Sequence, residues 1–297
     1  MNKQRISTSP VDVVIDELYH QQIPIETPEL ISTKLKELDE ELSRIPQEDK
    51  SDWLLAMDKC PDLVGDDKFR LIFLRCEVFN CTKAAKRMVK YWRKRVKLFG
   101  ISDAFRPLEL NEKGPLRNDL QSLEIGFFRA TDKKDPSGRS IVFCDPSRLS
   151  IDHSKYDNES VVRATWYVAH AALEDETTQR KGAVIIIHPQ NMRFAQFNPT
   201  LAKLFAESFK GCIPIRLSAL HFCHLPTIFD LIFPFLKMLM GSHLRKKIYL
   251  NSGEKSRVLD LFEEKFGISR QHLPIEIGGS LVLNQEKWIK ERIEKEC

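Results

Sequence analysis

The sequence predicts an α/β protein in which a helical region precedes a mixed, largely parallel sheet. Two apolar runs, Ala183–His188 and Arg216–His224, are separated by sequence with helical spacing, and a shorter run follows at Lys247–Leu250. Strands that alternate with helices are typical of parallel sheets. The run AVIIIH is β-branched and apolar up to its last residue, as expected of a strand buried on both faces. Through roughly the first 105 residues, apolar residues instead recur every three or four positions, which predicts helices.

The helical region can be divided by its capping signals. Residues 1–27 are expected to be mobile, with one short possible helix at Val11–His20. Thr27 can cap the next helix, and Pro28 suits its first turn. The helices expected after residue 27 are 28–44, Asp52–Lys59, Asp66–Phe79 and a basic helix that ends at Gly100.

The sheet region begins near residue 123. Asp135-Pro136-Ser137-Gly138 is a strong turn signal, so Leu123–Ala130 and Ser140–Cys144 are expected to form a hairpin. The helices expected in this region are Ser160–Asp175, Pro199–Phe209, Thr227–Met240 and Arg257–Phe266, the last closed by Gly267.

The composition is that of a folded chain. It has 297 residues, of which 42% are hydrophobic and 30% charged. No apolar run reaches the ~18–20 residues that span a bilayer, and residues 1–20 lack the apolar core of a secretory signal. Seven cysteines at ordinary density do not indicate a disulfide scaffold. We therefore expect a cytoplasmic, reducing location.

The basic helix has two interpretations. Residues 83–100 carry eight Lys or Arg and no acid. The block is either a solvated helix face or a surface that attracts an anionic membrane or nucleic acid. No zinc knuckle, Gly-rich RNA motif or aromatic stacking strand accompanies it, so nucleic acid is disfavoured as a partner.

Catalytic motifs are absent from the sequence. It has no phosphate-binding loop, dinucleotide fingerprint, HExxH or GxSxG. We therefore expect no enzyme activity, cofactor or metal. Strand alternation sends Cys223 and His224 to opposite faces, and His221 and Cys223 have no evident third ligand, so packed strand residues are favoured over a metal site.

Residues 225–240 form the most unusual segment. LPTIFDLIFPFLKMLM has only Asp230 and Lys237 as charges, and Pro234 should kink the helix. Such a helix is either buried in the core or faces lipid or a lipid-like ligand. The basic residues that follow it, at positions 245–247, favour transient docking to an anionic membrane.

Five motifs in order resemble the CRAL-TRIO family of lipid-binding proteins, over about Asp66–Asn284. They are FLRCEVFNCTKAAKRMVKYWRKR, the turn KDPSGRSIVF, the strand AVIIIH, the run RLSALHFCHLPTIFDLIFPFLKMLMGSHLRKKIYL, and LPIEIGGSL, which is similar to the family's closing LP-x-x-x-GG motif. The resemblance implies a helical lobe at 28–105, a lipid-binding domain at 120–284 with a mobile gate helix, and a C-terminal helix at 285–297.

The resemblance also implies functional residues. The gate residues would be Ile228, Phe229, Ile232, Phe233, Phe235, Leu236 and Leu239. Phosphoinositide or membrane contact would come from Lys86, Arg216, Arg245 and Lys247. The sequence departs from the phosphatidylinositol-transfer branch at Ile215, where that branch has glutamate, and at Glu77, where it has arginine.

Together these features predict a lipid carrier that holds a hydrophobic ligand in an apolar cavity beneath residues 225–240. The family implies a tocopherol-, retinoid-, sterol- or phospholipid-like ligand, and a cytoplasmic protein that associates transiently with membranes. His188, His221 and His224 are either polar handles for the ligand or ordinary sheet histidines. The alternative function is a protein-interaction adaptor that uses the acidic first 50 residues.

Overall fold

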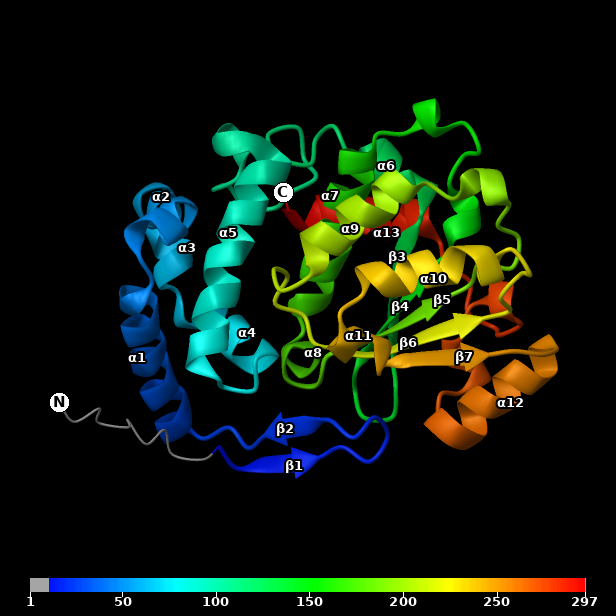
Figure 1. Cartoon of the computed structure of the whole chain (residues 1–297), viewed down its shortest axis with the longest axis horizontal. Coiled ribbons are helices and arrows are strands. Elements are labelled where there is room, and N and C mark those ends of the chain that lie inside the picture. The colour runs from blue at the N-terminus through cyan, green and yellow to red at the C-terminus, as the bar shows by residue number, and fades with distance from the viewer. Residues whose placement is uncertain (1–10, 297) are drawn as a thin grey trace.

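The computed structural model describes residues 11–296. A helical lobe lies beside a sheet domain (Figure 1). The lobe contains α1 (Pro28–Arg44), α2 (Ser51–Lys59), α3 (Pro61–Gly65), α4 (Asp67–Cys76) and α5 (Cys81–Asp103). The side chain of Thr27 accepts the N–H of Leu30, as its capping role predicts. The basic helix breaks at Gly100, which has φ 73°, and a last helical turn follows it.

The sheet has five strands in the order β3-β4-β5-β6-β7. They are β3 (Phe128–Lys134), β4 (Ser140–Cys144), β5 (Ala183–Ile187), β6 (Leu217–Cys223) and β7 (Ile248–Asn251). The β3–β4 pair is antiparallel and the other three pairs are parallel. The mixed, largely parallel sheet that the sequence predicts is therefore confirmed.

Strand alternation divides the side chains of the sheet between two apolar layers. On one face, α7 (Asn158–Leu173) and α9 (Pro199–Phe209) share a core with Val142, and α10 (Phe229–Leu239) packs on Leu220 and Phe222. On the other face, α12 (Lys255–Phe266) packs on Ile141 and Val184. The remaining helices are α6 (Leu120–Ile125), α8 (Glu176–Lys181), α11 (Ser242–Arg245) and α13 (Gln285–Glu296).

The N-terminal segment differs from its prediction. The helix expected at Val11–His20 is wrong, because β1 (Val13–Ile15) and β2 (Gln22–Pro24) form an antiparallel hairpin. Its β-branched residues favour strand, and the Asp16 carboxylate accepts the N–H of Tyr19 at 3.0 Å in the turn. Residues 1–10 lie outside the described residues, and the mobility of residues 1–27 stays a prediction.

The start of the sheet region is the second difference. Leu123 was expected in a strand, but it belongs to α6, which ends at Gly126 in a left-handed conformation with φ 68°. The first strand then begins at Phe128. Short apolar runs fit helix and strand equally well, so the pattern alone did not distinguish them. The domain boundaries near 27, 105, 120 and 284 stay predictions.

None of the helices in residues 11–296 combines the length and the hydrophobicity that crossing a bilayer requires.

Candidate functional site

Five of the seven predicted gate residues pack in the apolar layer between α10 and the sheet: Ile228, Phe229, Ile232, Phe233 and Leu236. Phe229, Ile232 and Phe233 are buried, and the other four predicted gate residues are half-buried: Ile228, Phe235, Leu236 and Leu239. The helix follows β6 directly, so the chain leaves the sheet and folds back over its own strand (Figure 1).

Aromatic side chains of α10 contact the residues beneath the helix. The ring centroid of Phe222 on β6 lies 5.3 Å from that of Phe233 and 6.1 Å from that of Phe229. Phe235 meets Phe197 edge-to-face at 5.7 Å. Side chains of α10 therefore occupy part of the apolar layer expected beneath residues 225–240. A ligand can replace these side chains only if α10 moves.

The outer face of α10 is partly apolar. Leu231 is 74% exposed and Met238 is 65% exposed. The Lys237 ammonium lies over the Phe233 ring, 4.5 Å from its centroid, in a cation–π contact. The helix therefore presents apolar side chains on two sides, toward the sheet and toward solvent.

Arg216 and Lys247 lie together at the amino ends of β6 and β7. Lys247 Nζ donates to the carbonyl oxygen of Leu217, the residue after Arg216. Arg216 donates to the carbonyl oxygens of Arg180 and Gln22, at 3.0 and 2.7 Å. No carboxylate within residues 11–296 forms an ion pair with either cation.

Burial shifts the protonation of both groups. Burial and the neighbouring charge of Arg216 lower the pKa of Lys247 to about 8. Burial also lowers the pKa of Arg216, although arginine stays charged near neutral pH. Arg216 is buried and Lys247 is half-buried, and within residues 11–296 their hydrogen bonds go to carbonyl oxygens. Such a pair of cations is suited to binding an anion.

Arg87 is a third cation that the sequence analysis missed. It donates to Glu77 Oε1 at 2.6 Å through Nε and to the carbonyl oxygen of Ile213 at 2.8 Å through Nη1. We call Arg87, Arg216 and Lys247 the cation cluster. Arg87 sits among eight basic residues in the sequence, and helical spacing alone gave no reason to select it.

The other two predicted cations are exposed. Lys86 is exposed on α5. Arg245 is exposed and donates through Nε to the carbonyl oxygen of Met240 at 2.9 Å, just after α10. The described side chains show no hydrogen bond that joins either residue to Arg216 or Lys247.

The histidines are packed within the sheet domain. His221 Nε2 lies 3.0 Å from the hydroxyl of Tyr19, and burial lowers the pKa of His221 to about 3. The rings of His188 and His224 meet edge-to-face at 5.4 Å. In the part of the chain that the structure describes, no three His, Cys, Asp or Glu side chains are placed to hold a metal ion. The His221 side chain is fully buried against the rings of Tyr249 and Phe262.

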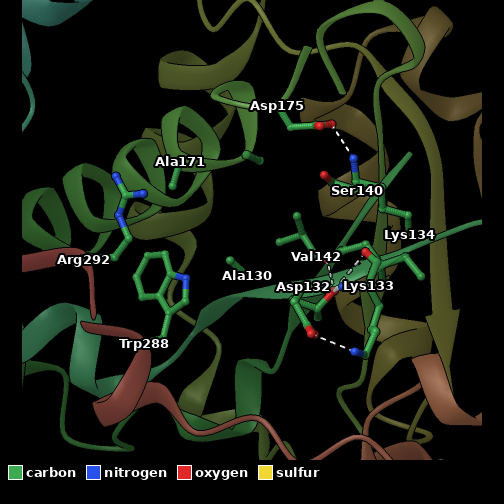
Figure 2. Close-up of a pocket in the computed structure, with 13 residues that line it drawn as sticks. Ala130, Asp132, Lys133, Lys134, Ser140, Val142, Ala171, Asp175, Trp288 and Arg292 are labelled. Atoms are coloured by element: carbon green, nitrogen blue, oxygen red, sulfur yellow. Dashed lines mark hydrogen bonds and ion pairs between the residues drawn. The ribbon is translucent and has the colours of Figure 1, made fainter. Parts of the chain in front are cut away.

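A separate pocket of about 210 Å³ opens between β3, β4, α7 and α13 (Figure 2). Trp288 and Arg292 line one side of it, and the Lys134–Asp175 ion pair, at 2.7 Å, lies at the other. None of the residues selected from the sequence lines this pocket.

Comparison with known proteins identifies relatives of the chain. A family model described as "CRAL/TRIO domain" matches residues 127–279, which is more than half of the chain. Clavesin-1 of Xenopus laevis is 26% identical over 259 residues, which cover 86% of this chain and 74% of that protein. Clavesin-2 of Homo sapiens is 25% identical over 260 residues, which cover 86% of this chain and 75% of that protein.

A solved structure gives the same answer for the fold. The crystal structure of Sfh5 aligns with a TM-score of 0.52 over 92% of this chain and 99% of that chain. The sequence identity is 14%, so this likeness concerns the fold alone.

Proposed function

The chain belongs to the CRAL/TRIO family of lipid-binding proteins, and from this premise we propose that it carries one hydrophobic lipid between α10 and the sheet. The observation that carries the proposal is the placement of the gate residues. Five of them lie in one apolar layer between the helix and the sheet, namely Ile228, Phe229, Ile232, Phe233 and Leu236, and the outer face of the same helix exposes Leu231 and Met238.

The energetics of this layer explain how a lipid can replace it. Burying a side chain such as Phe229, Ile232 or Phe233 stabilises by about 1.5–3 kcal/mol, so lifting α10 into water is unfavourable. At a membrane the same side chains enter hydrocarbon, and most of that loss is removed. A lipid that enters the vacated layer moves from the bilayer to another apolar environment. Each methylene that stays out of water in this way contributes about 0.8 kcal/mol to binding.

The cation cluster supports a second role, contact with an anionic lipid headgroup. Arg216 and Lys247 supply two positive charges without a carboxylate partner among residues 11–296. Phosphate oxygens accept hydrogen bonds from both kinds of donor. We therefore propose Arg216 and Lys247 as the main residues that contact a phosphoinositide. Lys86 and Arg245 act as outer residues that contact the membrane surface.

A transfer assay tests the carrier function. Donor vesicles carry fluorescent tocopherol-, retinoid-, sterol- or phospholipid-like probes, and the protein is expected to move one of these classes to acceptor vesicles. Mass spectrometry of lipid extracted from the purified protein identifies the class independently. Protein that neither carries lipid nor accelerates the transfer of any probe would overturn the proposal.

The carrier is expected to act without catalysis, in the cytoplasm, and to meet membranes only transiently. These expectations follow from the family and from the composition.

A second candidate function is a protein adaptor. The observation that favours it is the exposure of Leu54, Leu55 and Met57 on α2, in a lobe rich in carboxylates. A protein partner that binds Phe233→Asp as tightly as it binds the wild type would support the adaptor. If Phe233→Asp loses both its bound lipid and its binding to the partner, the adaptor function is contradicted.

A further inference from the structure

The cation cluster contains one carboxylate of its own. The segment Ile213–Leu217 contacts or contains all three cations. Arg87 donates to the carbonyl oxygen of Ile213, and Lys247 donates to that of Leu217. Arg216 belongs to the segment itself. Glu77 is bound to Arg87 at 2.6 Å. The charge of Glu77 also lies close enough to interact electrostatically with Arg216. The charges of Arg87, Arg216 and Lys247 all interact with the neighbouring Cys76.

The position of Glu77 is fixed by the end of α4. Glu77 is the residue that caps this helix, and its N–H donates to the carbonyl oxygens of Phe73 and Leu74, both at 3.2 Å. The next residues, Val78 and Phe79, have φ values of 53° and 56°, which turn the chain sharply toward α5. The side chain of Glu77 is 17% exposed, so the turn holds its carboxylate inside the cluster.

A carboxylate is unfavourable at this end of a helix. The carbonyl groups at a helix C-terminus carry partial negative charge, which favours cations there and disfavours anions. Glu77 is therefore stable in this position because Arg87 pairs with it. The consequence is that Arg87 is already neutralised, while Arg216 and Lys247 are not.

We propose that Glu77 is a built-in counter-ion that limits the cation cluster to ligands with a single phosphomonoester group. This inference rests on the proposed function and specifies the headgroup class of the same site. One phosphomonoester carries about −1.5 to −2 charges at pH 7, which Arg216 and Lys247 balance. A second phosphomonoester would have to displace Glu77 from Arg87 and would lie close to its carboxylate.

Two sources can supply a single phosphate group of this charge, a lipid headgroup or free phosphate. The experiment therefore uses phosphatidylcholine vesicles that contain either phosphatidylinositol monophosphate or bisphosphate, and in parallel inorganic phosphate without vesicles. Binding is measured for the wild type and for Glu77→Gln, a nearly isosteric change that removes the charge of a partly exposed side chain.

The wild type is expected to bind monophosphate vesicles at least as tightly as bisphosphate vesicles. Glu77→Gln is expected to gain about tenfold for bisphosphate vesicles and less than about threefold for monophosphate vesicles. Binding of vesicles without competition by inorganic phosphate assigns the lipid source, and competition by inorganic phosphate assigns the free one. Both outcomes support a site for a single phosphate group. Equal affinity changes for the two vesicle types, or none, would overturn the inference.

The matched control is Glu263→Gln. Glu263 is a half-exposed carboxylate on α12 that pairs with Arg270, so its removal changes the net charge equally but outside the cluster. A similar gain in this variant would show a general charge effect and would also overturn the inference. The lipid content of the proteins distinguishes failure of this inference from failure of the proposed function. If the proteins retain lipid but Glu77→Gln does not change headgroup selection, only the role of Glu77 is contradicted. If the wild-type protein carries no lipid, the carrier function is contradicted.

Discussion

The carbonyl oxygen of Leu217 receives two side-chain donors, Lys247 Nζ and Gln21 Nε2, the latter at 3.2 Å. Gln22 accepts Arg216 through its own carbonyl oxygen. The N-terminal hairpin therefore helps to position both uncompensated cations of the cluster. Arg216 and Lys247 were selected from the sequence by resemblance, whereas their supports on the hairpin lie about 200 positions away and have no local signal.

Lys247 is expected to make the proposed headgroup binding depend on pH. Its pKa is lowered to about 8, so its positive charge is present below pH 8 and is lost as pH rises through that value. Wild-type affinity for anionic vesicles is expected to fall about tenfold between pH 7 and pH 9.5 in a vesicle sedimentation assay, since a lost charge contact is worth about 1.4 kcal/mol. Lys247→Arg, which stays charged throughout, is the control. A fall of the same size in this variant would exclude Lys247 as the titrating group.

Buried histidines make the fold sensitive to acid. Burial lowers the pKa of His170 and His188 to about 4 and that of His221 to about 3, from an ordinary value near 6.5. The unfolded chain therefore binds more protons below about pH 6.5, and stability falls as pH decreases, by up to about 1.4 kcal/mol per pH unit for each histidine. Urea unfolding at pH 7, 6 and 5 should show a midpoint that decreases steadily. A constant midpoint would contradict this assignment.

At the scale of the element, α10 is defined by its two apolar sides. The sequence predicted its position within two residues of each end, because a long apolar run between two strands has few alternative structures. It did not predict which side chains the helix packs against. That result depends on the pairing of Phe233 with Phe222 and of Phe235 with Phe197, which only the folded structure brings together.

Two variants of α10 separate lipid binding from membrane contact. Phe233→Asp places a charge in the buried layer and is expected to abolish lipid retention and transfer. Leu231→Asp adds the same charge on the exposed face and is expected to retain lipid but to slow its transfer between vesicles severalfold. The readouts are bound lipid per chain and initial transfer rate. Identical behaviour of the two variants would contradict the assignment of the two faces.

The hairpin β1–β2 is the element for which sequence reasoning failed most clearly. Its Tyr19 ring stacks on Phe266 at 5.8 Å, and Glu26 pairs with Arg75 of α4 at 2.8 Å. These contacts connect the hairpin to the sheet domain and to the helical lobe, which explains its extended course beneath both (Figure 1). Tertiary contacts of this kind override a weak helical pattern.

The hairpin is expected to contribute measurably to stability. Tyr19→Ala removes a buried ring and should lower the free energy of unfolding by about 3 kcal/mol, the low end for deleting a large aromatic side chain. Val14→Ala, an exposed position of the same hairpin, serves as the control and should change it by less than about 0.5 kcal/mol. Urea denaturation provides the measurement. Equal effects of the two changes would show that the hairpin does not dock as described.

The whole molecule combines a dry layer beneath α10 with a cation cluster at the opposite ends of the strands. β6 connects the two, since Arg216 precedes its first residue and α10 follows its last by a short turn. Under the proposed function, the tail of the lipid would lie along β6 beneath α10, and its phosphate would meet the cluster at the amino end of the same strand. The order of the strands and of α10 could be predicted from the sequence. The role of Arg87 could not, because its pairing with Glu77 is visible only in the folded structure.

The central claim is that one lipid occupies the layer between α10 and the sheet. Native mass spectrometry of the protein after incubation with vesicles, wild type beside Phe233→Asp, measures this occupancy directly. The account predicts a single lipid adduct per wild-type chain and none on the variant, with both proteins folded. A wild-type chain that stays free of lipid, or a variant that keeps the same adduct, would contradict it.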